Sequence, residues 1–259
     1  MPIDVWDPQR GGAERYLDRL SRELIARGHE VTVLCSEQRV STAPGQGGPH
    51  LQGGPDVQVL RVPRFPRWLR ELSFAKEAVR VHRSSGRDIL FAVRHALEAD
   101  VYQPHGGSLR AAREAAGRAL PPWRQRARAV AGGLRPALRV LLWLDREVFS
   151  RSPRLVTVSV SRKVEDDLRR VYPEVQFRFE RIYNPIDAEL FHDRDRSERA
   201  AGLRSRFGIP AHRRIAVFAA HSFRPKGLHH ALSAVAALPE WHLVVAGLLQ
   251  KNPTAVGQG

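Results

Sequence analysis

Residues Arg214 to Gly247 read RIAVFAAHSFRPKGLHHALSAVAALPEWHLVVAG, and this stretch decides the fold. The apolar runs at 214–219 and 241–246 are typical of buried strands, and residues 228–238 between them favour a helix. We therefore predict a strand, a turn, a helix and a strand in that order, which is the opening unit of a parallel α/β layer. The turn at 221–227 is basic and ends in a glycine, so it has the composition of a phosphate-binding loop.

The same alternation of strands and helices runs through the rest of the chain. Helices are expected at 13–27, 67–83, 110–149 (with breaks at Pro121-Pro122 and Gly132-Gly133), 162–171 and 197–207. Strands are expected at 30–36, 57–62, 88–93, 100–103, 155–159 and 178–183. Residues 1–9 hold two prolines and no apolar run, so the first strand of such a fold is expected to be nearly absent. Residues 38–54 are rich in Gly, Pro and Ser and are expected to form a loop.

This alternation predicts an α/β fold of Rossmann-like, doubly wound parallel sheets. We place one Rossmann-like domain at residues 1–190. Residues 191–259 then hold a linker helix and the first part of a second Rossmann-like domain. Ligands of such sheets bind in the loops at the carboxyl ends of the strands, so the site residues are sought there.

The composition indicates a folded, cytoplasmic protein. A hydrophobic fraction of 42% suffices for a packed core, and the sequence shows neither a signal peptide nor an apolar run that could cross a membrane. The one cysteine, Cys35, excludes a disulfide framework and is expected to be buried at a strand end. The sequence has no metal-ligand spacing, P-loop or GxGxxG motif, so neither a metal nor a dinucleotide cofactor is expected.

The net charge of +15 is concentrated in part of the chain. Residues 108–154 contain eleven arginines, no lysine and three acidic residues, and tryptophans and leucines interleave with the arginines. We predict that this segment docks on an anionic membrane surface through Trp123, Arg124, Arg126, Arg128, Arg135, Arg139 and Trp143. The alternatives are side chains that pack on the domain or are merely solvated, arginine enrichment from a GC-rich genome, and a nucleic-acid-binding module. No RNA- or DNA-binding motif supports the last of these.

Three loops carry the candidate site residues. Gly11 and Gly12 precede the first helix, where close backbone approach and exposed N–H groups favour an anion. His105 follows a strand and precedes two glycines, a position from which it can hydrogen-bond a sugar or phosphate oxygen. The basic turn supplies three candidates for holding a diphosphate: His221, Arg224 and Lys226. The ordinary alternatives are a common helix start, a structural histidine and a solvated basic turn.

Several segments, taken in order, resemble glycosyltransferase family 4, whose members have the GT-B fold and are retaining, metal-independent enzymes. The segments are GGAERYL at 11–17, ARGHEVTV at 26–33, VSVS at 158–161, IYNPID at 182–187, RFGIP at 206–210 and RPKG at 224–227. The arginine-rich helical segment after His105 is similar to that of bacterial lipopolysaccharide core glucosyltransferases. The resemblance covers nearly the whole chain.

The resemblance implies transfer of a sugar from a nucleotide-sugar donor to a cell-envelope glycan or glycolipid acceptor. It places Gly11 and Gly12 between the donor diphosphate and the acceptor, and it places His105 near the transferred sugar. Lys226 matches the lysine that neutralises the departing diphosphate, which is electrostatic stabilisation of a leaving group without a metal ion.

The sequence also departs from the family pattern. The family's arginine stands several residues before the lysine, whereas here His221 occupies roughly that place and Arg224 is nearer. The family's two glutamates, seven residues apart in the second domain, have no counterpart before residue 259. The resemblance therefore implies that this chain by itself is weakly active or inactive, with a non-catalytic membrane- or nucleic-acid-binding module as the alternative.

Overall fold

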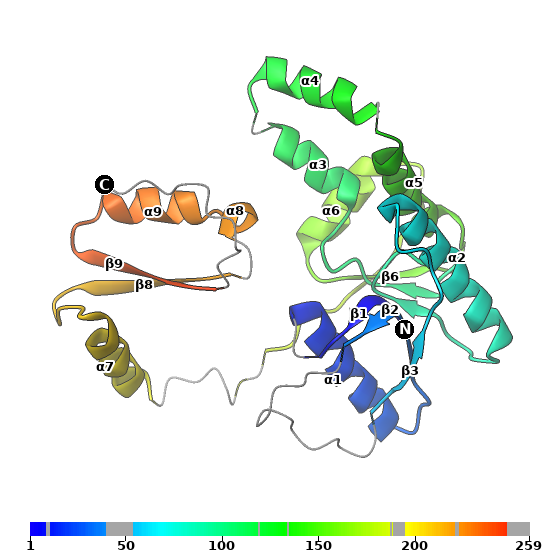
Figure 1. Ribbon diagram of the computed structural model, residues 1–259, viewed down its shortest axis with the longest axis horizontal. Coiled ribbons are helices and arrows are strands. Elements are labelled where there is room, and N and C mark those ends of the chain that lie inside the picture. The colour runs from blue at the N-terminus through cyan, green and yellow to red at the C-terminus, as the bar shows by residue number, and fades with distance from the viewer. Residues whose placement is uncertain are drawn as a thin grey trace. The chain divides into compact units, whose positions relative to one another are not determined.

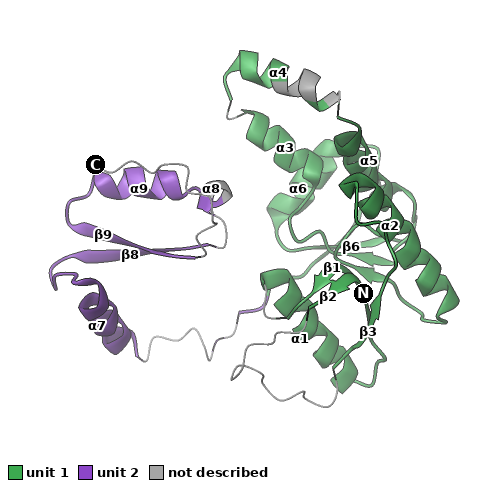
Figure 2. Ribbon diagram, viewed as in Figure 1, with its two compact units in different colours: residues 1–184 green, residues 185–259 purple. Residues whose placement is uncertain are grey.

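The computed structural model of the chain contains two compact units, residues 1–184 and 185–259 (Figure 2). It describes residues 1–8, 11–39, 54–118, 120–133, 135–186, 188, 195–220 and 223–247, with the backbone alone for 128–131, 133, 224 and 225. The domain boundary expected between residues 190 and 191 lies outside the described residues, as does most of the loop expected at 38–54.

Parallel strands form the centre of the first unit (Figure 1), as the alternation predicts. One sheet has the order β1-β2-β3 and consists of β1 (Pro2–Trp6), β2 (Thr32–Gln38) and β3 (Asp56–Val59). The other has the order β4-β5-β6-β7 and consists of β4 (Phe91–Ala92), β5 (Val101–Tyr102), β6 (Val156–Ser159) and β7 (Arg178–Arg181). All the pairs are parallel, and β1 contacts β4 where the two sheets meet.

Strand β1 contradicts the expectation that the first strand is nearly absent. Pro2 is its first residue, where a missing N–H group is tolerated. Asp4 sits within the strand, and its carboxylate accepts a hydrogen bond from Ser36 Oγ at 2.7 Å and pairs with Arg94. The apolar side chains that the strand buries are Ile3, Val5 and Trp6. The prolines and Asp4 interrupt the apolar pattern, so the sequence did not indicate this strand. The partners of the strand all lie far away in the sequence.

Six helices of the first unit follow the predicted pattern. They are α1 (Gly12–Ala26), α2 (Arg67–Ser84), α3 (Leu109–Arg118), α4 (Pro122–Gly133), α5 (Pro136–Ser150) and α6 (Arg162–Val171). The helical segment expected at 110–149 is broken near Pro121 and after Gly133, as predicted. Ser161 caps α6, because its Oγ accepts from Val164 N at 3.4 Å.

The main core of the first unit lies between α2, α5, α6 and the strands β4 to β6. Phe149 of α5 packs edge to face on Tyr102 of β5, with 5.3 Å between ring centroids, and tilts against Tyr172 at 5.8 Å. Such aromatic pairs contribute about 0.5–1.5 kcal/mol each beyond burial. A smaller cluster under α1 holds Leu17 and Cys35, so the cysteine is buried as expected.

The second unit begins with α7 (Arg196–Phe207), which ends at Gly208 in the left-handed conformation at φ 61°. It continues with β8 (Arg214–Ala219), α8 (Phe223–Lys226), α9 (Leu228–Ala236) and β9 (Trp241–Ala246). β8 pairs in parallel with β9 from Arg214↔Trp241 onward, which confirms the predicted strand–helix–strand unit.

Residues 223–226 were expected to form a turn and instead form the helix α8. Pro225 lies within the first turn of this helix, where its missing N–H would have no intrahelical partner in any case. Gly227 has φ 80°, which ends α8 and starts α9 in a new direction.

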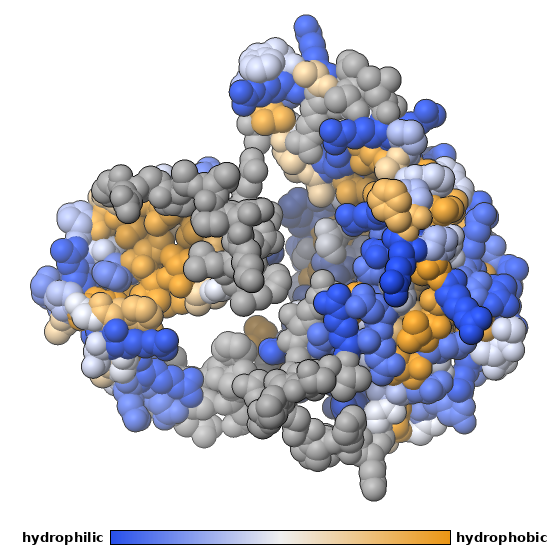
Figure 3. All heavy atoms as spheres, in the orientation of Figure 1, coloured by the Kyte–Doolittle hydropathy of each residue, from blue (hydrophilic) through white to orange (hydrophobic). Residues whose placement is uncertain are grey.

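Apolar side chains remain exposed on the second unit, and Figure 3 shows a hydrophobic patch over β8 and β9. Val217 and Val245 are among the exposed residues of these strands. Within the described ranges, no helix combines the length and the apolar character needed to cross a bilayer.

Candidate functional site

The carboxyl ends of β4 and β5 open into a cavity of about 330 Å³ in the first unit. His95 follows β4 and His105 follows β5, and both line this cavity. The loop Gly106–Gly107 and the start of α3 supply backbone to the wall, and Asp145 of α5 lies behind it. The cavity therefore stands at the edge of the sheet where parallel α/β proteins bind ligands.

His105 is half-buried in this cavity, and burial lowers the pKa of its imidazole. Among the described residues, no hydrogen-bond partner reaches its buried Nε2. The ring stands edge to face against Tyr16, with 4.7 Å between centroids. A neutral imidazole with a buried and unpaired nitrogen is poised to exchange a hydrogen bond with a ligand.

Tyr16 connects His105 to the predicted glycines, because it lies one helical turn after Gly12 in α1. Gly11 is the N-cap residue of α1 and has no side chain with which to cap the helix. A Cβ atom placed on Gly12 would meet nothing within 4 Å, whereas one placed on Gly11 would lie 2.9 Å from the Glu14 carboxylate. Through Tyr16, His105 contacts the helix that starts at Gly12.

Asp145 is a buried carboxylate that the sequence did not mark as part of the site. Its Oδ2 accepts from Tyr172 OH at 2.6 Å, from Ser108 Oγ at 2.8 Å and from Arg110 N at 3.2 Å. Its Oδ1 accepts from Leu109 N at 3.3 Å. Asp145 therefore caps the N-terminus of α3 from another helix, where a negative charge is favoured.

Burial by itself would raise the pKa of Asp145, but the hydrogen bonds that it accepts outweigh this effect. The side chains of His95, Tyr172 and Ser108 together hold the pKa of the carboxyl below its usual range. Asp145 is therefore ionised at neutral pH. Burial, and then the hydrogen bond to Asp145 and its charge, raise the pKa of the Tyr172 hydroxyl. As a result, the carboxylate accepts each of its hydrogen bonds and the neighbouring groups donate them.

Two further residues near the carboxyl edge of β5 were missed from the sequence. Gln103 is fully buried, and within the described part of the chain neither its Nε2 nor its Oε1 has a hydrogen-bond partner. Arg94 lines the cavity and is paired with Glu71 at 2.6 Å and with Asp4. Asp145 lies on the apolar face of a predicted helix. A charged residue in such a position indicates a buried polar cluster, and this is the signal by which the sequence could have marked the site.

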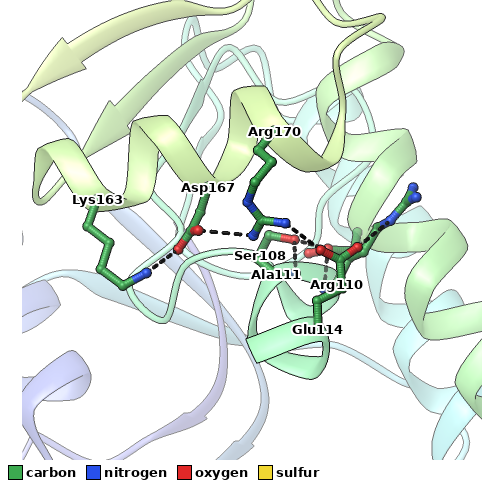
Figure 4. A network of polar contacts seen from close by, with 8 residues as sticks. Ser108, Arg110, Ala111, Glu114, Lys163, Asp167 and Arg170 are labelled. Atoms are coloured by element: carbon green, nitrogen blue, oxygen red, sulfur yellow. Dashed lines mark hydrogen bonds and ion pairs between the residues drawn. The ribbon is translucent and has the colours of Figure 1, made fainter. Parts of the chain in front are cut away.

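A chain of ion pairs fixes α3 against α6 beside this site (Figure 4). Arg170 of α6 bonds Glu114 of α3 and Asp167 of its own helix, and Lys163 bonds Asp167 at 2.6 Å. Arg110 completes the chain at Glu114, at 3.4 Å. These charges are mostly solvent-exposed, so each pair contributes little to stability. The network neutralises part of the arginine excess within the protein itself.

The candidates on the basic turn lie in the second unit. Lys226 is the last residue of α8 and is exposed. Arg224 lies within α8, and only its backbone is described. His221 lies outside the described residues.

The predicted docking residues fall on α4 and α5. Trp123 has 65% of its surface exposed, and Arg124 lies over its ring at 4.8 Å. Trp143 is 38% exposed, with Arg151 at 5.6 Å from its ring centre. The other predicted residues with exposed side chains are Arg126, Arg135 and Arg139, and the side chain of Arg128 lies outside the description.

The chain also matches known proteins. The family model described as Glycosyltransferase Family 4 matches residues 10–190. A crystal structure of WaaG, a glycosyltransferase involved in lipopolysaccharide biosynthesis, matches with a TM-score of 0.68 at 19% sequence identity. This match covers 94% of the chain and 62% of WaaG, so the chain spans less than two thirds of that protein. No match is found among curated protein sequences.

At this level of identity the match to WaaG establishes the fold alone. The fold is of the GT-B type, with the first part of the second Rossmann-like domain present, as the sequence predicted. The residues that the family model covers include Gly11, Gly12 and His105, whereas Lys226 lies beyond them. In the described part of the chain, no three His, Cys, Asp or Glu side chains gather as a metal site would require.

Proposed function

Because the chain belongs to glycosyltransferase family 4, we propose that it serves the transfer of a sugar from a nucleotide-sugar donor to a cell-envelope glycan or glycolipid. The observation that carries the proposal is the contact of His105 with Tyr16 of α1, the helix that begins at Gly12. A histidine whose buried Nε2 has no partner among the described residues, in contact with a helix that starts after a glycine, suits a sugar linked to a diphosphate. The involvement of WaaG in lipopolysaccharide biosynthesis supports a cell-envelope acceptor.

In this proposal the donor diphosphate approaches the N–H groups at Gly11 and Gly12, where a helix N-terminus stabilises negative charge by about 0.3–1 kcal/mol or more. His105 hydrogen-bonds the sugar that is transferred, and its neutral form suits a contact with a hydroxyl. In the second unit, the exposed Lys226 has the charge that neutralises a departing diphosphate. The sugar keeps its anomeric configuration, and the leaving group is stabilised by protein charges without a metal ion.

We also propose that the protein binds and acts at an anionic membrane surface. Trp123, Arg124 and Arg126 of α4 are exposed, and no side chain described in this helix is buried. A helix with exposed tryptophan and arginine side chains gains free energy at a lipid interface from both the ring and the charges. The acceptor glycolipid would then be presented at the same surface.

The decisive test incubates the chain with UDP-, ADP- and GDP-sugars and a mild-acid core oligosaccharide of lipopolysaccharide. Saturation-transfer NMR should show donor binding, and proton NMR of any glycoside formed should show the donor's anomeric configuration. EDTA should leave both results unchanged. A protein that binds none of these donors, or that yields an inverted product, contradicts the proposal.

A further inference from the structure

A second histidine faces the cavity that His105 lines. His95 follows β4 as His105 follows β5, and both contribute to the same wall. The side chain of His95 keeps 19% of its surface exposed, so it can be reached from the cavity. Neither the sequence motifs nor the family resemblance gives this residue a role.

Asp145 holds one nitrogen of the His95 ring. His95 Nε2 lies 3.5 Å from Asp145 Oδ1, which is a long contact, and hydrogen bonds in ligand sites are often long before the ligand arrives. The four other groups that bond this carboxylate all donate to it. An ionised carboxylate can only accept, so Nε2 of His95 carries a proton.

The other ring nitrogen, Nδ1, is a hydrogen-bond acceptor when the imidazole carries its proton on Nε2 alone. The hydrogen bonds found among the described residues leave Nδ1 of His95 unengaged. The same restraint by a carboxylate orients histidines in many binding sites.

The other groups around the cavity indicate the chemistry of the ligand. Arg94 is already neutralised by Glu71 and Asp4. The start of α3, which would attract a phosphate, is already occupied by the carboxylate of Asp145. The cavity therefore offers imidazole nitrogens, glycine backbone and an apolar wall, which suit the hydroxyl groups of a neutral sugar better than an anion.

We propose that His95 contacts the acceptor directly, with Nδ1 accepting a hydrogen bond from an acceptor hydroxyl while Asp145 holds its Nε2–H. In this arrangement Asp145 is a positioning residue, since it acts on the ligand only through the ring of His95. The inference rests on the proposed function, because it names how the same site recognises its acceptor. His95 then holds the acceptor and His105 the transferred sugar, from the ends of two neighbouring strands.

The first test determines the tautomer of His95 in the whole chain, with 15N-labelled histidine and long-range 15N–1H correlation. The signals of His95 are assigned by their loss in His95→Gln. We expect a proton on Nε2 in the unsubstituted protein, and a mixture of tautomers in Asp145→Asn. A proton on Nδ1 overturns the inference, and the unsubstituted protein alone decides this if Asp145→Asn does not fold.

The second test adds the mild-acid core oligosaccharide of lipopolysaccharide to the same labelled protein. Saturable shifts of the His95 signals are expected. An oligosaccharide that binds in saturation-transfer NMR and leaves His95 unchanged overturns the inference but leaves the proposed function standing. An oligosaccharide that does not bind the protein at all contradicts both.

A matched pair of variants separates ligand contact from structural support. His95→Gln keeps an N–H group for Asp145 and loses the acceptor at Nδ1, whereas His95→Asn keeps an oxygen near the position of Nδ1. The Kd for the oligosaccharide should rise at least tenfold in His95→Gln and be largely restored in His95→Asn, with nucleotide-sugar binding unchanged in both. Equal weakening in both variants, together with a lower Tm, would assign His95 a structural role and overturn the inference.

Discussion

The ring of Tyr16 meets the ring of His105 edge to face, with 4.7 Å between their centroids. This contact joins α1 to the loop after β5, two segments that are almost ninety residues apart. Since α1 begins at Gly12, the contact also ties the orientation of His105 to the first turns of that helix. A single aromatic pair thus organises the proposed donor side of the site.

Replacing Tyr16 with alanine should release His105. The lost aromatic contact costs about 0.5–1.5 kcal/mol, which lowers stability slightly. Because the imidazole is no longer held, we expect the Kd for the nucleotide-sugar, measured by calorimetry, to rise at least tenfold. Tyr16→Phe keeps the ring and should retain most of the affinity, so equal losses in both variants would contradict the role given to the ring.

Gly12→Ala tests whether a ligand approaches the start of α1. The added Cβ meets nothing within 4 Å, so the Tm should remain unchanged or rise. A donor diphosphate that approaches these N–H groups would clash with the new methyl group, and nucleotide-sugar affinity should fall about tenfold, measured by calorimetry. Gly117→Ala, also in open space but on α3, is the matched control and should leave the affinity unchanged.

Glu165 should govern much of the acid sensitivity of the fold. It accepts from Arg181 Nε and from a second Arg181 nitrogen, both at 2.7 Å, and from Ser159 Oγ at 2.5 Å. The hydrogen bonds from Arg181 and then from Ser159 lower the pKa of this carboxyl to about 2. Its contribution is therefore complete above the unfolded-state pKa near 4.5 and is lost as the pH falls toward 2.

Glu165→Gln removes this contribution at neutral pH. Denaturant unfolding between pH 2 and pH 7 should show a flatter acid limb in the variant than in the unsubstituted protein. Asp166→Asn, on the same helix but 79% exposed, is the control and should leave the limb unchanged. An unaltered acid limb in Glu165→Gln would show that the pair with Arg181 does not persist in solution.

Gln103→Met should stabilise the protein. The amide is fully buried, and the described residues give neither of its polar atoms a partner, which costs about 1–3 kcal/mol per group. A methionine of similar length removes that cost, so the Tm should rise by several degrees. A lower Tm in thermal denaturation would show that a buried water satisfies the amide.

Trp123→Ser should weaken membrane docking without affecting the fold, because the side chain is mostly exposed. Sedimentation with phosphatidylglycerol vesicles at low salt should show a several-fold loss of binding. Arg124→Glu should have a similar effect that disappears at high salt, since each arginine contributes about 1 kcal/mol through screened charge. Equal binding to vesicles of neutral phosphatidylcholine would contradict an electrostatic contribution.

Most of the fold could be predicted from periodicity, and the exceptions have local causes. The helix α6 and the strands β8 and β9 form at their predicted bounds, because their apolar patterns are unbroken. β4 and β5 are only two residues long, since the chain leaves the sheet early to form the cavity. β1 was missed because the charge on Asp4 is balanced by residues from β2, α2 and the loop after β4, which no local pattern shows.

The candidate site could be predicted in part. A histidine between a strand and two glycines indicates the edge of the sheet formed by the carboxyl ends of the strands, and His105 lies at that edge. His95 and Asp145 left no motif, because they meet through tertiary packing across fifty residues of sequence. The ring contact between Tyr16 and His105 was not predicted for the same reason. In the sequence, Tyr16 is an ordinary apolar position of an amphipathic helix.

The contacts of Asp145 should restrict which substitutions occur around it, and this restriction should be visible in aligned sequences of the family. One carboxylate satisfies Ser108, Tyr172 and the first N–H groups of α3, and it also faces His95. A lineage that replaces Asp145 with an apolar residue leaves several buried donors without an acceptor at once. Among close homologues, positions 95, 108, 145 and 172 are therefore expected to change together or not at all.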